Sequence, residues 1–179
     1  MVLPWLTIGH SNRSAGDFAG LLQAAGAQKV IDVRTVPRSR ANPQFNTDTL
    51  PDTLLSHGIG YEHRAALGGL RGRSREVPRE VNGFWENDSF HNYADYALSM
   101  PFREALDALI GEGRQRRLAL MCAEAVWWRC HRRIIADYLI ARGDEVFHIM
   151  GEGRLEPARL TAGAIVRPDL SVVYPSPPG

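Results

Sequence analysis

Residues 6–33 read LTIGHSNRSAGDFAGLLQAAGAQKVIDV and contain the pattern that decides the fold. Leu6-Thr7-Ile8 and Lys29-Val30-Ile31-Asp32-Val33 have the continuous apolar character of strands that are covered on both faces. Between them, Ser14 and Asp17 form an N-terminal capping signal, and apolar residues follow at helical spacing. A strand, a helix and a second strand within about 30 residues form a βαβ unit, so the two strands are expected to be parallel.

The same alternation continues along the chain. Apolar runs predict further strands, and capped or amphipathic stretches predict further helices. The strands are expected at 59–63, 118–121 and 145–149, and the helices at about 49–57, 93–97, 102–110 and 130–142. Residues 172–174 are expected to add an edge strand, 65–92 to form a long loop or lid, and 175–179 a flexible tail. We therefore expect residues 1–179 to form a single α/β domain with a mostly parallel sheet of about five strands.

Composition limits the classes of function. The 179 residues suit one domain, and they contain no apolar run of the length that a membrane helix needs and no secretory signal at the start. Two cysteines are too few for a disulfide framework, so a cytoplasmic protein is expected. The net charge of +1 argues against binding to nucleic acid through bulk charge. Twenty of the 21 basic residues are arginines, which offer bidentate contacts to phosphate or carboxylate groups.

Polar and reactive residues gather where the predicted strands end. Because ligands bind beyond the carboxyl ends of parallel strands, these residues are expected to share one site. They are His10 and Ser11 after the first strand, Asp32, Arg34 and Ser39 after the second, His63 and Arg64 after the third, and Cys122, Glu124, Cys130, His131 and Arg132 after the fourth. The alternative is that polar residues simply fill the loops.

Cys122 has the most specific placement among these residues. A thiol directly after a buried strand and before a helix start is in a setting that lowers a thiol pKa, which favours a nucleophile. A buried filler and a metal or redox role are the alternatives. The interval from Cys122 to Arg129 is one residue longer than the phosphatase loop of tyrosine phosphatases and contains two tryptophans, which argues against that class. A zinc site built from Cys122, Cys130, His131 and His10 has no sequence signature.

The segment Cys130-His131-Arg132 is expected to lie on the first turn of a helix, where free N–H groups bind anions. Arg132 would hold the anion there, with Arg34 as a second clamp. His131 or His10 would transfer protons, and Asp32 or Glu124 would orient them. The alternatives are a structural pair of Asp32 with Arg34 and a loop contact for His131. Trp127 and Trp128 are expected either to stack on a base or to cover the core.

Several of these motifs together resemble a known family. They are Thr7-Ile8-Gly9-His10-Ser11, Asp32-Val33-Arg34 with Pro37 and Ser39, Leu67-Gly68-Gly69, and Cys122-Ala123-Glu124 followed by Cys130-His131-Arg132. In order and spacing, over nearly the whole chain, they resemble domain-of-unknown-function family 488. The resemblance implies a bacterial, Rossmann-like three-layer domain and brings no assigned reaction. Val126-Trp127-Trp128 departs from the more polar stretch expected at that place.

The leading hypothesis from the sequence is a small cysteine-dependent hydrolase or transferase. Its substrate would be a small phosphorylated or nucleotide-like anion, with Ser11, Ser39 and Cys130 among the binding residues, and the sequence names no cofactor. The alternatives are a non-catalytic module that binds nucleotide or nucleic acid, and a Cys/His metal-binding protein.

Overall fold

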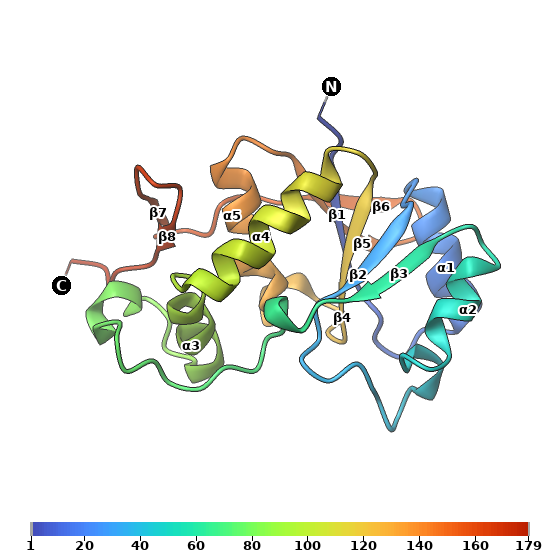
Figure 1. Ribbon diagram of the computed structural model, residues 1–179, viewed down its shortest axis with the longest axis horizontal. Coiled ribbons are helices and arrows are strands. Elements are labelled where there is room, and N and C mark those ends of the chain that lie inside the picture. The colour runs from blue at the N-terminus through green and yellow to red at the C-terminus, as the bar shows by residue number, and fades with distance from the viewer. Residues whose placement is uncertain (1, 179) are drawn as a thin grey trace.

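The computed structural model describes residues 2–178 and contains a six-stranded sheet in the order β3-β2-β4-β1-β5-β6 (Figure 1). The first five strands are parallel, as the sequence predicts. The strands are β1 (Trp5–Gly9), β2 (Lys29–Asp32), β3 (Gly60–His63), β4 (Leu118–Cys122), β5 (Val146–Gly151) and β6 (Arg154–Pro157). Met1 and Gly179, the two ends of the predicted domain, lie outside the described residues, and Gly179 is also the end of the predicted tail 175–179.

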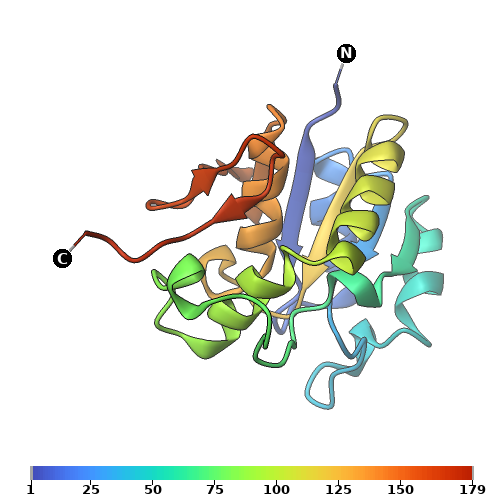
Figure 2. The ribbon, with the colours of Figure 1, turned by 60° about the vertical axis from the view of Figure 1, so that its left-hand side comes forward.

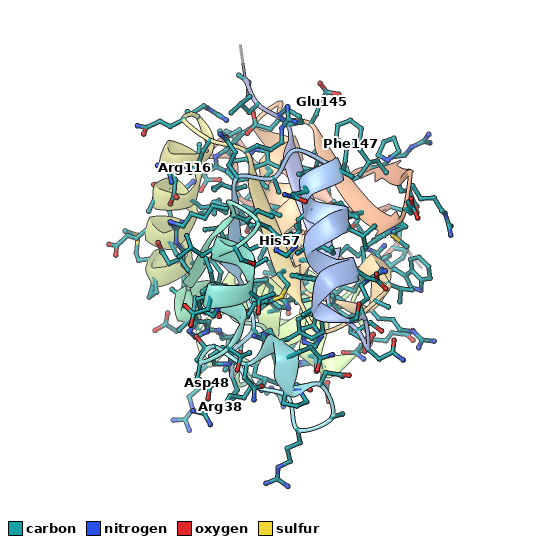
Figure 3. The ribbon with its side chains drawn as sticks, turned by 90° about the vertical axis from the view of Figure 1, so that its right-hand side faces the viewer. Arg38, Asp48, His57, Arg116, Glu145 and Phe147 are labelled. Atoms are coloured by element: carbon teal, nitrogen blue, oxygen red, sulfur yellow. The ribbon has the colours of Figure 1, made fainter. Side chains whose placement is uncertain are left out.

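Helices cover both faces of the sheet, which gives the three layers of a Rossmann-like domain. On one face, α1 (Ala15–Ala24) and α2 (Leu50–Leu55) pack against the sheet, and Figure 3 shows them in front of it. On the other face lie α4 (Met100–Gly113) and α5 (Arg132–Ala141), with α3 (Asp88–Tyr96) beside them. Buried side chains from β1, β2 and β4 contribute to the hydrophobic cores on both faces, which explains why these strands read as continuous apolar runs.

The local signals around the first βαβ unit are confirmed. Ser14 is the N-cap of α1, and its hydroxyl accepts a hydrogen bond from the Asp17 backbone N–H at 3.1 Å. β1 lies in the centre of the sheet between β4 and β5, and Gly9 at its end pairs with Cys122 at the end of β4. The carboxyl ends of β1, β2 and β4 therefore meet at one edge of the sheet.

The mostly parallel sheet is confirmed with one strand more than the five expected, and two expectations about elements were wrong. β6 is a sixth strand that pairs antiparallel with β5; its four residues are all exposed, so it has no apolar pattern to reveal it. Residues 172–173 form β8, which pairs with β7 (Ile165–Val166) in a separate hairpin beside α5 rather than at an edge of the sheet (Figure 2). The last helix begins at Arg132 with His131 as its N-cap, so Cys130 precedes the helix.

The segment 65–92 is irregular, as expected, but it is anchored. It contains two short 3₁₀ turns, Ala65–Leu67 and Arg79–Asn82, and its last residues start α3. The hydroxyl of Tyr93 donates to the Leu67 carbonyl at 2.9 Å and that of Tyr96 to the Ala66 carbonyl at 2.6 Å. These bonds hold the start of the segment against α3, close to the carboxyl edge of the sheet.

Candidate functional site

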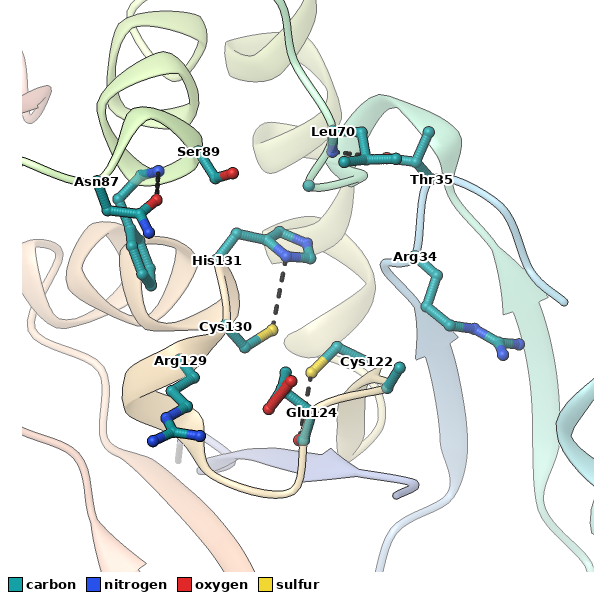
Figure 4. A pocket seen from close by; sticks show the side chains of 13 residues that line it. Arg34, Thr35, Leu70, Asn87, Ser89, Cys122, Glu124, Arg129, Cys130 and His131 are labelled. Carbon is teal, nitrogen blue, oxygen red and sulfur yellow. Dashed lines mark hydrogen bonds between the residues drawn. The ribbon is translucent and has the colours of Figure 1, made fainter. Parts of the chain in front are cut away.

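A cavity of about 320 Å³ opens at the carboxyl ends of β2 and β4 (Figure 4). Its wall comes from the segments after these two strands, from the 65–92 segment, from the start of α3 and from the residues before α5. The lining residues are 34–35, 69–70, 87, 89–90, 122–124 and 129–131. Of the residues expected to share one site, Arg34, Cys122, Glu124, Cys130 and His131 line this cavity.

Cys122 is positioned by a close contact between β1 and the turn that follows β4. The backbone N–H groups of His10 and Ser11 donate to the carbonyls of Cys122 and Ala123 at 2.8 and 3.0 Å. Gly9 is required for this contact, because a Cβ atom there would lie 1.6 Å from the Glu124 carbonyl oxygen. The Cys122 side chain lines the cavity but is only 3% exposed.

Arg132 lies behind the thiol of Cys122 and is completely buried. Its Nη1 is 3.4 Å from Cys122 Sγ, its Nη2 donates to the Ala125 carbonyl, and its Nε has no hydrogen-bond partner. None of the ion pairs formed within residues 2–178 includes Arg132. Burial raises the pKa of Cys122, but the Cys130 thiol and the Arg132 charge outweigh it, so that the pKa lies below its ordinary value.

Cys130 and His131 form the opposite wall of the cavity. The Cys130 sulfur accepts a hydrogen bond from the Arg132 backbone N–H at 3.4 Å and lies 3.5 Å from His131 Nδ1. His131 Nε2 donates to the Val33 carbonyl at 2.8 Å. Burial raises the pKa of Cys130 well above its ordinary value and lowers that of His131 to about 4, so Cys130 is a thiol and His131 a neutral ring near pH 7.

His10, Asp32 and Arg34 form a separate buried cluster beside the cavity. The guanidinium of Arg34 binds both oxygens of Asp32, at 2.9 and 2.7 Å, and also the Phe45 carbonyl at 2.7 Å. His10 stacks on Phe45, with its Nδ1 2.8 Å from the Ser11 carbonyl and its Nε2 3.3 Å from Arg34 Nη1; burial lowers its pKa. Asp32 therefore orients an arginine rather than a histidine. Arg34 lines the cavity, but most of its donors bind Asp32, Phe45 and His10.

Of the remaining predicted site residues only Glu124 lines the cavity, and His63 and Arg64, at and after the end of β3, are outside it. Glu124 is exposed and lines the cavity. Ser11 and Ser39 are outside the lining: Ser11 takes a left-handed conformation (φ 49°) in the turn after β1, and the Ser39 hydroxyl accepts a hydrogen bond from the Asn42 backbone N–H at 3.0 Å. Arg132 is also outside it, so its guanidinium faces Cys122 rather than the open cavity.

Other lining residues were not predicted as site residues. They are Thr35, Gly69, Leu70, Asn87, Ser89, Phe90, Ala123 and Arg129. Asn87 is the N-cap of α3, where its side chain accepts a hydrogen bond from the Phe90 backbone N–H at 3.2 Å. The capping pattern at 87–90 was a local signal for this helix start, but it contained no information about which face would meet the cavity.

The two tryptophans lie outside the cavity. The Trp127 ring stacks on His148 at 4.9 Å between centroids, and the Arg133 guanidinium lies 5.5 Å from the same ring. Trp128 is 45% exposed, and neither ring lines the cavity. Within residues 2–178 no group of three or more His, Cys, Asp or Glu side chains is arranged to hold a metal ion. No helix in this part of the chain is long and apolar enough to cross a membrane.

Comparison with known proteins identifies a family. Residues 14–139 match the family described as domain of unknown function DUF488. No curated protein and no solved structure matches the chain significantly. The matched segment contains every residue that lines the cavity, whereas His10 and Ser11 lie outside it. Because the match spans more than half of the 179 residues, the chain belongs to the DUF488 family.

Proposed function

We propose that this protein is a cysteine-dependent enzyme whose nucleophile is the thiolate of Cys122. The observation that supports this most directly is the burial of Arg132, 0% exposed and without a carboxylate partner in residues 2–178. A buried charge that lacks a counter-ion costs on the order of several kcal/mol. Ionisation of Cys122, 3.4 Å away, provides that counter-ion, so the fold itself favours the reactive form of the thiol.

The cavity supports a small anionic substrate, such as a phosphorylated or nucleotide-like compound. Its volume of about 320 Å³ suits a small molecule rather than a polymer. Arg129 is exposed on its wall and forms no ion pair with the described residues, so its planar guanidinium is available for a phosphate group. The polar side chains of Asn87 and Ser89, at the start of α3, line the same cavity and add hydrogen-bonding groups.

The reaction that fits this arrangement is a two-step group transfer. Cys122 Sγ attacks the phosphorus atom; the S–P bond forms as the bond to the leaving group breaks, and the leaving group takes the electron pair. Water then attacks the same atom and releases the thiolate. Glu124 is the exposed carboxyl group on the cavity wall, so it is the group proposed to take the proton from the water.

The first test is the pH dependence of alkylation by iodoacetamide on the folded protein. Trypsin separates the two thiols because Arg129 precedes Cys130, so Cys122 is read in peptide 118–129 and Cys130 in peptide 130–132. Cys122 is expected to react with an apparent pKa below the roughly 8.5 of a free thiol, and Cys130 much more slowly. If neither thiol reacts until the protein is unfolded, Cys122 is not a nucleophile.

The second test concerns the anion. Inorganic phosphate is expected to protect Cys122 from alkylation, and the variant Arg129→Gln is expected to abolish this protection without abolishing the reactivity of Cys122. Arg159→Gln, which replaces an exposed arginine outside the cavity lining, serves as the matched control and should keep the protection. Equal protection in both variants would exclude Arg129 as the anion contact.

A further inference from the structure

Cys130 is a second thiol in the cavity, and the proposed attack by Cys122 does not use it. Both side chains line the same cavity, and Figure 4 shows their sulfur atoms directed toward each other. Arg132 contacts both: its guanidinium is 3.4 Å from Cys122 Sγ and its backbone N–H is 3.4 Å from Cys130 Sγ. One residue thus fixes the positions of the two sulfur atoms relative to each other.

The proton on Cys130 has a defined acceptor. The Val33 carbonyl can only accept, so the hydrogen bond at His131 Nε2 requires the proton to be on that nitrogen. In the neutral ring Nδ1 then has no proton and presents a lone pair to the Cys130 sulfur 3.5 Å away. The charge of Arg132 helps to lower the pKa of Cys122, whereas burial raises that of Cys130. The two thiols are therefore unequal: Cys122 is the one that ionises, and Cys130 is the donor beside it.

We infer that Cys130 is a resolving thiol, which converts oxidised Cys122 into a Cys122–Cys130 disulfide and so makes inactivation by hydroperoxides reversible. This inference rests on the proposed function, because it needs a reactive Cys122. It also gives Cys130 a role other than the substrate contact expected from the sequence.

The chemistry has two balanced steps. In the first, the Cys122 thiolate attacks a peroxide oxygen; the S–O bond forms, the O–O bond breaks, and the sulfur loses two electrons as hydrogen peroxide is reduced and releases hydroxide. In the second, Cys130 Sγ attacks the sulfenic sulfur; the S–S bond forms and the S–O bond breaks. The proton of Cys130 passes through His131 Nδ1 to the departing hydroxide, which leaves as water.

The test oxidises the folded protein with hydrogen peroxide and maps tryptic peptides without reduction. In the wild type, peptides 118–129 and 130–132 are expected to be joined by a disulfide, with loss of iodoacetamide labelling at Cys122 that dithiothreitol restores. In Cys130→Ser the sulfenic acid on Cys122 should persist and be trapped by dimedone. The wild type should form no dimedone adduct, because the disulfide consumes the sulfenic acid. Cys122→Ser should give neither product. Cys130→Ala replaces Cys130→Ser if the serine variant melts at a lower temperature.

The outcomes separate this inference from the proposed function. If Cys122 alkylates rapidly but peroxide gives the same dimedone adduct or sulfinic acid in the wild type and in Cys130→Ser, with no linked peptide, Cys130 does not resolve Cys122 and the nucleophile proposal remains. If neither reagent modifies Cys122 in the folded protein, both proposals are overturned.

Discussion

At the scale of single residues, the charge on Glu124 works against the charge on Arg132. Both act on Cys122: the guanidinium lowers the pKa of the thiol, and the carboxylate raises it. Glu124→Gln removes the negative charge at an exposed position, so the pKa of Cys122 should fall further, by on the order of half a unit for charges near a protein surface. Alkylation of Cys122 near neutral pH should become faster, and its pH profile should move to lower pH.

The control for Glu124→Gln is Glu152→Gln, an equally conservative change at an exposed residue outside the cavity lining. It should leave the alkylation profile where it is in the wild type. Under the proposed mechanism Glu124→Gln also slows turnover of a substrate, because the amide accepts no proton from water. A variant that alkylates faster and turns over as fast as the wild type would remove Glu124 from the mechanism but leave Cys122 in it.

At the scale of elements, the 65–92 segment meets the start of α5 at Gly69. A Cβ atom on Gly69 would lie 2.4 Å from His131 Nδ1, and the ring is held by its bond to the Val33 carbonyl. Gly69→Ala should therefore displace the histidine and lower the free energy of unfolding by about 1–3 kcal/mol, the usual cost of overpacking. Denaturant unfolding measures this change.

Gly72→Ala provides the matched comparison for Gly69→Ala. A Cβ atom on Gly72 meets nothing within 4 Å, although the residue belongs to the same segment. Its free energy of unfolding should stay within about 0.5 kcal/mol of the wild type. Equal stability of the two alanine variants would mean that the segment moves away from α5 at little cost, which is the behaviour expected of a lid.

At the scale of the whole molecule, the sequence predicts the layers and the edge of the sheet at which the cavity opens, because both follow from apolar runs. Buried parallel strands need continuous apolar side chains, and their carboxyl ends converge at one edge. β6 could not be predicted in this way, because its four residues are exposed and show no apolar run. Backbone pairing with β5 holds this strand in the sheet.

The groups that the arginine side chains contact could not be predicted from the sequence, for a different reason. Arg34 and Arg132 were both expected to bind a substrate anion. In the structure Arg34 binds Asp32, and the guanidinium of Arg132 lies against Cys122. A loop arginine carries the same charge in either role. Only the packing decides whether that charge faces the cavity or the interior.

The buried histidines make acid sensitivity a property of the whole fold. Burial and the Arg132 charge lower the pKa of His148 to about 3, and burial lowers that of His131 to about 4. Above about pH 6.5 each ring is neutral in both the folded and the unfolded chain. Below it the unfolded chain gains protons that the folded chain does not, so stability is lost as the pH falls. Glu62, whose pKa is lowered to about 2 chiefly by its bond to Arg64, adds a loss only below about pH 4.5.

The interval from pH 7 to pH 5 lies above the range in which Glu62 contributes. Over it, His148 alone should lower the free energy of unfolding by about 2 kcal/mol. In His148→Gln the decrease in the free energy of unfolding between pH 7 and pH 5 should be smaller than in the wild type by that amount. Each protein is compared with itself at the two pH values, so a difference in stability at pH 7 does not affect the result. His57→Gln, at a partly exposed position after α2, is the matched histidine variant for comparison. If His148→Gln shows the full wild-type loss, the His148 ring gains its proton between pH 7 and pH 5 in the folded protein as it does in the unfolded chain. Trp127 would then stack on a cation, and the charge of Arg132 beside Cys122 would be screened more strongly than its burial implies.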